Sequence, residues 1–378
     1  MTTVPALPAE AYAAALASLD RMTAPRLRML LGRLSPPDAY AVVSGSAPPP
    51  GLLEQLFDVP GLAASWRQSA AEHLPERAWQ QCLDLGLQVM TIGTESYPAV
   101  LINDPAPPAV LFARGSASAL AGRRVAIVGT RNATGAGREM AGSLGRDLAG
   151  AGVHVVSGLA RGIDGCAHRG ALSVDNGAAP IAVVACGLDI VYPPEHRALF
   201  AAVSERGLVV SEAPPGAPPE AYRFPLRNRI IAAFSEVVVV VESRESGGSL
   251  ITVDEARRRA ITVMAVPGSV RSRASNGTND LVRDGCPIVT DVDDVLTALG
   301  LDSSRVAEAS YDSRPRPAGF DLELLMLCKE ARNLDQLVLL TSRPVIECAM
   351  AVARLEVHGW LQQVNGWFER APNAAYTT

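Results

Sequence analysis

The stretch RRVAIVGTRNATGAGREMAGSLGRDLAGAGVHVVSG, from Arg123 to Gly158, combines two short apolar runs with a longer segment between them. The runs RRVAIVG and HVVSG are rich in valine, isoleucine and alanine, as expected of strands that are buried on both faces of a sheet. The segment AGREMAGSLGRDLAGAG between them has a helical pattern. A strand, a crossover helix and a second strand form a right-handed βαβ unit, so this stretch predicts a parallel sheet.

The same alternation continues along the chain. Further strands are predicted in PIAVVAC, GLVVSE, EVVVVVES and TVMAVPG, and helices in GIDGCAHRGALS, PEHRALFAAVSERG and LITVDEARRRA. Alternating strands and helices are typical of an α/β fold with a doubly wound, mostly parallel, Rossmann-like sheet. Ligands of such sheets bind at the carboxyl ends of the strands, so the loops at those ends are the candidate sites.

Patterns outside the sheet divide the chain into four regions. Residues 1–87 contain short helical pieces separated by proline-rich breaks, and residues 88–301 contain the strand–helix alternation. Residues 302–319 are rich in serine, proline and charge, which predicts a linker. Residues 320–378 form a short third module.

The composition limits the class of protein. The 378 residues have a net charge of −5, so any contact with nucleic acid requires a local patch of positive charge. No charge-free run approaches the ~20 residues that span a bilayer, and the N-terminus lacks a signal-peptide pattern, so no membrane association is expected. The six cysteines have neither C-x-x-C spacing nor histidine partners, which argues against metal sites and disulfides. These features predict a cytoplasmic protein.

The loop VAIVGTRNATGAG is the first candidate site. Arg131 occupies the place of the second glycine of the dinucleotide motif G-x-G-x-x-G, and the strand HVVSG ends without an acidic residue for a ribose hydroxyl. NAD or FAD is therefore not expected, and no cofactor is predicted. Two interpretations remain: the Arg131 guanidinium and the amides of the following helix hold one phosphate, or the loop is a tight turn with a solvated arginine.

The second and third loops contain groups with less specific patterns. In VSGLARGIDGCAHRGAL, Gly158 frees the turn and Arg161 adds a positive charge. Asp164 and His168 are one helical turn apart, as in a catalytic pair or a structural polar network. The network is favoured because no serine or cysteine nucleophile accompanies them. In CGLDIVYPPEHRALF, Tyr192 either stacks on a base or packs within a rigid turn.

A fourth loop is expected in YRFPLRNRIIAAFS, where Arg227 and Arg229 flank Asn228 directly before a buried strand. Buried or half-buried arginines require an anionic partner, so at least one of the two is expected to contact a phosphate at the sheet edge. The alternative is an ion pair with Glu212 or Glu242 at the ends of neighbouring strands.

The fifth loop, ESRESGGSLITVDEA, contains Ser246, Gly247, Gly248 and Ser249 directly before a helix. Small residues with free amides at a helix start form an anion cradle, but the final G-K-[ST] of a P-loop is missing. Arg271 lies on a nearby loop. Together the five loops offer arginines and small polar residues with few acids or bases, which suits binding a phosphodiester chain better than catalysis. No catalytic residue and no metal ligand is predicted.

The segments VAIVGTR, SGLARGID, CGLDIVYP, SEAPPG, FPLRNRIIAAFS, SGGSLIT, AVPG and GTNDLVRDG follow one another in this order. Together they closely resemble the DNA processing protein A family, also called DprA or Smf, over nearly the whole of residues 88–301. The resemblance implies a sterile-alpha-motif-like (SAM-like) domain at residues 1–87 and a winged-helix domain at residues 320–378.

The resemblance also implies a function. Proteins of this family bind single-stranded DNA and load the recombinase RecA onto it during natural transformation and recombination, displacing single-strand-binding protein. They act as homodimers through the sheet domain, and no chemistry is ascribed to them. The candidate DNA-binding residues are Gly129, Thr130, Arg131, Gly158, Arg161, Arg227, Asn228, Arg229, Ser246, Gly247, Gly248, Ser249 and Arg271.

An enzyme is the alternative function. Phosphoribohydrolases share this sheet architecture and use a P-G-G-x-G-T-x-x-E loop, and Glu255 lies near the place of its glutamate, although the second glycine-threonine pair is missing. In the C-terminal module, the helix in RPVIECAMAVARLEVHGWL has nearly balanced charge. That balance favours a protein–protein or structural role over duplex binding. Trp360 and Trp367 are expected in the core of this module.

Overall fold

The computed structural model describes residues 7–301, 315, 317–364 and 366–371. These belong to two compact units, divided at residues 303 and 304. Most of the predicted linker, residues 302–314 and 316, lies outside the described residues. Each unit is described by itself.

From residue 7 onward, the first unit begins with six α-helices. Their ends follow local signals: Ser35, for example, accepts a hydrogen bond from Asp38 N, and prolines occupy the first turn of the helix that follows. The helices are α1 (Ala9–Ser18), α2 (Ala24–Leu31), α3 (Pro36–Ser44), α4 (Glu54–Phe57), α5 (Leu62–Glu72) and α6 (Pro75–Asp84).

An eight-stranded sheet follows, in the order β1-β2-β6-β5-β4-β3-β7-β8. All six predicted strands are confirmed as β3 to β8. The two strands that lead into them were not predicted; β1 and β2 pair with each other, and β2 pairs with β6, in antiparallel register. The strands are β1 (Gln88–Thr91), β2 (Val110–Gly115), β3 (Arg124–Gly129), β4 (His154–Ser157), β5 (Ile181–Val184), β6 (Leu208–Ser211), β7 (Val237–Glu242) and β8 (Thr262–Ala265).

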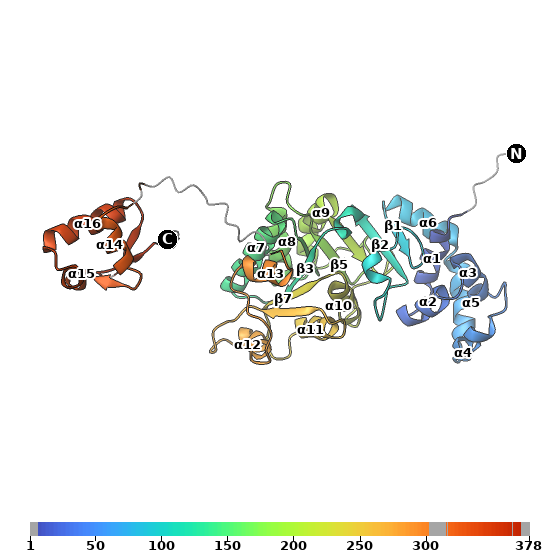
Figure 1. Ribbon diagram of the computed structural model, residues 1–378. Helices are drawn as coiled ribbons and strands as arrows, with labels where there is room; N and C mark the ends of the chain where they lie inside the picture. The colour runs from blue at the N-terminus through green and yellow to red at the C-terminus, as the bar shows by residue number, and fades with distance from the viewer. Residues whose placement is uncertain (1–6, 302–314, 316, 365, 372–378) are drawn as a thin grey trace. The chain divides into compact units, whose positions relative to one another are not determined.

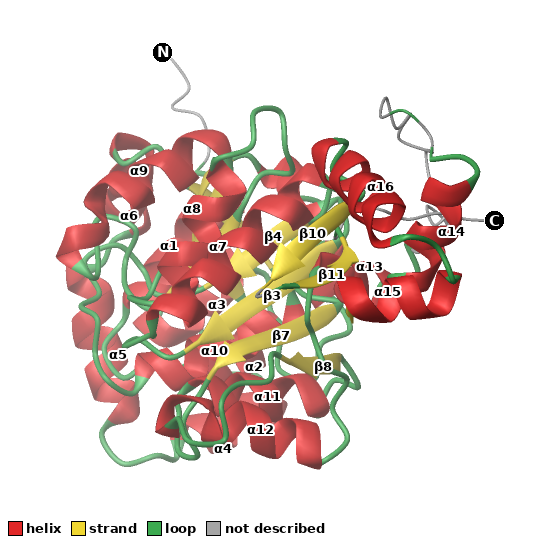
Figure 2. Cartoon of the chain, turned by 90° about the vertical axis from the view of Figure 1, so that its left-hand side faces the viewer, coloured by secondary structure: helices red, strands yellow, loops and turns green. Residues whose placement is uncertain are grey.

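Helices cover both faces of this sheet, which confirms the doubly wound α/β fold (Figures 1 and 2). One face carries α7, α8 and α9, and the other carries α10, α11 and α12. The strand order reverses at β3, which has β4 on one side and β7 on the other. The helices are α7 (Gly135–Gly150), α8 (Ile163–Leu172), α9 (Arg197–Arg206), α10 (Arg223–Ala233), α11 (Ser249–Arg257), α12 (Asn276–Arg283) and α13 (Val292–Ala298).

The N-terminal helices share a hydrophobic core with the sheet. Leu16 and Trp66 belong to the same buried cluster as Phe112 and Val209 of β2 and β6. Burying large side chains of this kind contributes about 1.5–3 kcal/mol each, so this contact holds the helices on the antiparallel end of the sheet. The domain boundary at residue 87 stays a prediction; α6 ends just before it and β1 begins just after it.

The described residues of the second unit form three α-helices and a three-stranded antiparallel sheet of order β10-β11-β9. These are the elements of which a winged helix is built. Trp360 lies in its core as expected, but Trp367 is 43% exposed on β11, so that prediction is wrong. The elements are α14 (Phe320–Leu327), β9 (Arg332–Asn333), α15 (Leu334–Thr341), α16 (Val345–Val357), β10 (Leu361–Val364) and β11 (Trp367–Arg370).

No single helix among the described residues has the length and apolar content to cross a membrane. The pair α15 and α16 meets that test together, by length and composition only, with a bend of 116° between the two helices.

Candidate nucleic-acid interface

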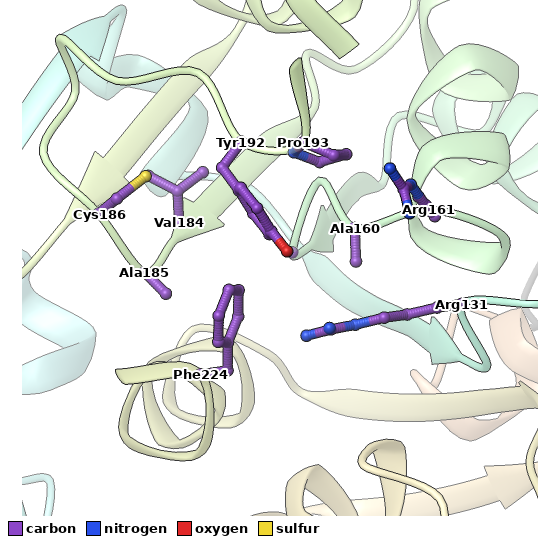
Figure 3. A pocket seen from close by; sticks show the side chains of 10 residues that line it. Arg131, Ala160, Arg161, Val184, Ala185, Cys186, Tyr192, Pro193 and Phe224 are labelled. Carbon is purple, nitrogen blue, oxygen red and sulfur yellow. The ribbon is translucent and has the colours of Figure 1, made fainter. Parts of the chain in front are cut away.

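A pocket opens at the carboxyl ends of β3, β4 and β5 (Figure 3). The loop after β3 contributes Arg131, the loop after β4 contributes Gly158 and Arg161, and the first turn of α10 contributes Phe224. Three of the predicted site residues therefore meet here. The lining residues are Arg131, Gly158, Ala160, Arg161, Val184, Ala185, Cys186, Tyr192, Pro193 and Phe224.

Two aromatic rings and an arginine form one side of the pocket. The Arg131 guanidinium carbon lies 4.7 Å from the centroid of the Phe224 ring. The Tyr192 and Phe224 rings have centroids 5.6 Å apart and are tilted by 53° (Figure 3). Tyr192 is 40% exposed, so it packs on Phe224 and still presents ring surface to solvent. A planar ligand can therefore stack on these rings beside a positive charge.

Arg161 adds a second exposed charge at the rim of the pocket. It forms an ion pair with Glu195, and both side chains are exposed. The hydrogen bond between them raises the pKa of Arg161 and lowers the pKa of Glu195. Because water screens an exposed pair, Glu195 is a weakly held partner that an incoming phosphate can replace.

Beneath the pocket lies a buried guanidinium. Arg227 is 7% exposed and donates a hydrogen bond to the Val183 carbonyl. Burial lowers the pKa of Arg227 to about 10, and the nearby Asp164 carboxylate opposes that effect, so Arg227 is charged at neutral pH. A Cβ atom at Gly158 would overlap the Arg227 guanidinium, so the backbone at Gly158 lies directly against it. Arg227 thus supports the pocket from below.

Asp164 and His168 belong to this buried layer. The Asp164 carboxylate accepts a hydrogen bond from Gly158 N at 3.1 Å, which holds the loop after β4. Burial raises the pKa of Asp164 and lowers the pKa of His168 to about 3. Neither side chain lines the pocket. Among the described residues, no hydrogen bond joins Asp164 to His168, and both ring nitrogens of His168 are buried without a hydrogen-bond partner, so neither a catalytic pair nor a polar network between the two is supported.

The segment with Arg227, Asn228 and Arg229 is helical, so the prediction of a fourth loop is wrong. All three residues lie within α10, because the helix starts at Arg223, well before the strand. Arg229 is buried and bonds both oxygens of Glu212, at 2.6 and 2.5 Å. This is one of the two ion pairs considered as the alternative to a phosphate contact. Asn228 donates to the Gly248 carbonyl at 3.2 Å and links α10 to the loop before α11.

The start of α7 already holds a carboxylate from the protein itself. Glu242, which is 4% exposed, accepts hydrogen bonds from Thr134 N at 3.2 and 3.3 Å and from Thr134 Oγ1 at 2.7 Å. A Cβ atom at Gly137 would overlap the same carboxylate. The positive end of the helix is therefore neutralised internally. The interpretation in which these amides hold a phosphate together with Arg131 is not supported; Arg131 instead extends over Phe224.

Gly129 and Thr130 shape the loop that carries Arg131. Gly129 ends β3 against Ile163 and the Glu242 carbonyl, with no room for a Cβ atom. Thr130 N donates to that same carbonyl at 2.7 Å. Both residues position the neighbouring arginine, and neither lines the pocket.

The predicted anion cradle divides into exposed and buried parts. Ser246 and Gly248 are exposed, whereas Ser249 is buried and donates to Ser243 Oγ at 2.9 Å. Gly247 N bonds the Arg244 carbonyl at 3.0 Å, which closes a turn. Arg271 is exposed on the loop before α12. None of these residues lines the pocket.

Phe224 is the functional candidate that the sequence analysis missed. Its signal was available: it precedes Arg227 by three residues, so on a helix the two side chains lie on one face. Treating the segment as a loop concealed that relation. No group of three or more His, Cys, Asp or Glu side chains suited to a metal ion occurs in the described part of the chain.

Comparison with known proteins agrees with this architecture. Residues 88–300 match the model of the family "DNA recombination-mediator protein A". The chain is 36% identical over 290 residues to protein Smf of Escherichia coli, covering 75% of this chain and 77% of that protein. It is 38% identical over 215 residues to DNA processing protein DprA of Bacillus subtilis, covering 57% of this chain and 72% of the relative.

Solved structures give the same result. The X-ray structure of DNA processing protein A from Streptococcus pneumoniae superposes with a TM-score of 0.66 at 28% identity, covering 76% of this chain and 97% of that one. A structure of the Helicobacter pylori protein, which concerns its single-stranded DNA binding mode, has a TM-score of 0.51 at 28% identity and covers 57% and 97% of the two chains. With its sequence, sheet order and family match in agreement, this chain belongs to the DNA recombination-mediator protein A family, known as DprA or Smf.

Proposed function

We propose that this protein binds single-stranded DNA at the pocket formed by Arg131, Arg161, Tyr192 and Phe224. In this proposal it loads RecA onto the bound strand during natural transformation and recombination and displaces single-strand-binding protein. It acts in the cytoplasm as a homodimer through the sheet domain, without catalysing a reaction.

The observation that carries the proposal is the arrangement around Phe224. Two aromatic side chains and two exposed arginines lie within one pocket. Proteins that bind single strands combine base stacking on aromatic rings with cations along the phosphate backbone. Bases of a duplex are stacked on one another and cannot enter such a pocket without unpairing, so the arrangement favours single strands.

A related protein supports single-stranded DNA as the proposed ligand. The Helicobacter pylori protein, 28% identical, is described with a single-stranded DNA binding mode. The residues carried over from the family include Arg131, which this structure places in the pocket, and Arg227 and Arg229, which are buried. In our proposal Arg131 and Arg161 contact phosphate, and Arg227 and Arg229 position α10.

The proposal is tested by fluorescence anisotropy of a labelled oligo-dT, with unlabelled duplex as competitor, over a range of salt concentrations. Phe224→Ala is expected to weaken binding by about 1–3 kcal/mol with a smaller change in salt dependence than Arg131→Ala, because stacking itself neutralises no phosphate. Arg131→Ala is expected to lower the salt slope by about 0.7, the value for one contact with a single strand.

Arg146→Ala is the matched control, because Arg146 is an exposed arginine of α7 that does not line the pocket. It is expected to bind as the wild type does. Equal losses in Arg146→Ala and Arg131→Ala would indicate a general effect of charge and contradict a localised site. If the wild type preferred duplex DNA, the proposal would fail.

RecA loading requires its own experiment. RecA filament formation is followed on oligonucleotides coated with single-strand-binding protein, with and without this protein. We expect wild type to accelerate filament formation and Phe224→Ala to lose most of that effect. If wild type and Phe224→Ala accelerated filament formation equally, RecA loading would not depend on the pocket.

The alternative function, hydrolysis of nucleoside monophosphates, requires Glu255 for activity. In the structure the Glu255 carboxylate is bonded to Arg258 and Arg259, each at 2.6 Å, and Arg259 also bonds Asp104. These contacts favour a structural role for Glu255. Release of a free base from nucleoside monophosphates, abolished by Glu255→Gln, would support the enzyme.

A further inference from the structure

Helix α16 has two apolar faces, of which its own unit covers one. The inner face packs into the core of the second unit through Cys348, Ala351, Val352 and Leu355. On the outer face, Ile346 is 68% exposed, Met350 is 54% exposed and Val357 is 82% exposed, and Ala353 is exposed between them. Within the second unit itself, no described residue covers this outer stripe. An exposed apolar patch of this kind marks an interaction surface.

The spacing of the outer stripe is that of a coiled-coil seam. Ile346, Met350, Ala353 and Val357 follow one another at intervals of four, three and four residues, which places them at successive d, a, d and a positions of a heptad. A helix with this seam packs against a second helix along its length. The seam therefore fits a helical partner rather than a flat or irregular surface.

The charges beside the seam distinguish between partners. In the heptad assigned above, the e positions are Glu347 and Arg354, and the g positions are Ala349 and Glu356. Two antiparallel copies of α16 bring each e position next to the e position of the other copy. Glu347 of one copy then faces Arg354 of the other, and the two-fold axis repeats the pair. A parallel arrangement pairs Ala349 with Arg354 and offers no such match.

We propose that the outer face of α16 binds the same face of α16 in a second copy of this chain, in antiparallel orientation. The interface is isologous, with the layers Ile346–Val357 and Met350–Ala353 each occurring twice across the two-fold axis. This contact is separate from the proposed DNA site and from the proposed dimer of the sheet domain.

The ion pairs within one chain do not prevent this contact between two copies. Arg354 bonds Asp321 at 2.6 Å, and Glu347 lies 3.3 Å from Arg343. The side chains of Arg354 and Glu347 remain 48% and 47% exposed, so each can take a second partner of opposite charge. Nucleic acid fits this surface poorly: residues 317–371 contain seven acidic and five basic residues, so the unit has no excess of positive charge.

Disulfide formation between full-length chains tests the proposal. Chains with Ile346→Cys and chains with Val357→Cys are mixed under mild oxidation, and each is also oxidised alone. The antiparallel layers bring positions 346 and 357 together across the interface. They hold two copies of position 346 apart by about eleven residues of helix, roughly 16 Å. The mixture should give about ten-fold more covalent dimer than Ile346→Cys alone. Wild type reports the background from native cysteines.

A charge-reversal experiment adds a second, independent readout. Glu347→Arg alone and Arg354→Glu alone each place like charges opposite one another, and both are expected to reduce cross-linking in the cysteine background. Mixing the two reversed chains restores opposite charges at both pairs and should recover the cross-link. Mixing cannot repair an ion pair within one chain, so recovery assigns the effect to the contact between copies.

Three outcomes would overturn the proposal. Efficient cross-linking of Ile346→Cys with itself would indicate parallel helices, and no cross-link above background would exclude this contact. Binding to phosphatidylcholine vesicles that competes with the cross-link would assign the apolar face to a lipid surface. Oligo-dT binding by the same chains is measured in parallel and should be unchanged, so a failure of the proposed DNA site remains distinguishable.

Discussion

At the scale of single residues, the pocket depends on the space that a glycine leaves. Gly158 lies between the pocket and the Arg227 guanidinium, and its amide donates to Asp164. A buried charge needs its hydrogen bonds intact, because an unpaired guanidinium costs several kcal/mol. The pocket and the buried Arg227 guanidinium are therefore separated only by the backbone at Gly158.

Replacing Gly158 with alanine tests this relation. We expect Gly158→Ala to displace Arg227 or the loop after β4, lowering the free energy of unfolding by about 1–3 kcal/mol. We also expect it to weaken oligo-dT binding. Urea denaturation and fluorescence anisotropy measure the two effects. Gly150→Ala is the control, since a Cβ atom at Gly150 meets nothing within 4 Å. Equal stability of both variants would contradict the account of the buried layer.

At the scale of elements, α10 and α7 decide which groups are available to a ligand. Helical geometry places Phe224 and Arg227 on one face of α10, the first lining the pocket and the second beneath it. The start of α7, where related folds bind phosphate, instead holds Glu242 from the end of β7. Thr134 at the start of α7 is thereby bonded to Glu242, and the pocket lies at the carboxyl ends of β3, β4 and β5.

Glu242→Gln tests the role of this internal carboxylate. Removing the charge while keeping the side-chain size weakens the bonds from Thr134 and the favourable interaction with the helix dipole. We expect the free energy of unfolding to fall by about 1–2 kcal/mol in urea denaturation. Thr134→Val should have an effect of similar size, and the double variant should lose less than the sum. Additive losses would show that the two side chains do not act together.

The buried His168, in the centre of α8, is expected to make the free energy of unfolding depend on pH. Its pKa is about 3 in the folded protein because burial disfavours the charged ring, against 6.5 for an ordinary histidine. Between these values the unfolded chain binds a proton that the folded chain does not, so stability is lost as pH falls below 6.5. In this range His168 contributes up to about 1.4 kcal/mol per pH unit to the slope of the free energy of unfolding against pH.

We therefore expect His168→Gln to show a shallower loss of stability on acidification. The free energy of unfolding is measured by urea denaturation between about pH 5 and pH 7. The control is His73→Gln, at a partly exposed histidine of the same unit. If His168→Gln and wild type had the same slope, the buried ring would not be the source of the acid sensitivity.

At the scale of the whole molecule, the chain is built from two units with separate cores. The core of the second unit is formed only by residues after position 319, and the candidate DNA pocket lies wholly in the first unit. A chain that ends at residue 301 should therefore retain oligo-dT affinity within a few-fold of the full chain and should unfold in a single cooperative transition. Loss of DNA binding on this truncation would assign part of the site to the second unit.

Much of the sheet was predictable because its signals are local. Runs of valine and isoleucine identified β3 to β8, and the helical pattern of AGREMAGSLGRDLAGAG identified α7. The strands β1 and β2 were missed because each depends on antiparallel pairing with a distant partner rather than on a βαβ unit. The segment before β7 was assigned to a loop because it stands directly before a buried strand and at least one of its two arginines was expected to contact a phosphate, whereas both arginines are buried within a helix.

The sequence by itself determined the fold class, the family and the edge of the sheet at which arginines and glycines gather, because apolar periodicity and short motifs are properties of the chain alone. Only the tertiary structure decided which of those residues line the pocket and which are buried. Arg131 and Arg161 reach the pocket, whereas Arg227 and Arg229 are enclosed by Val183, Asp164 and Glu212. Exposure and ion pairing depend on partners far away in the sequence, and only folding brings those partners together.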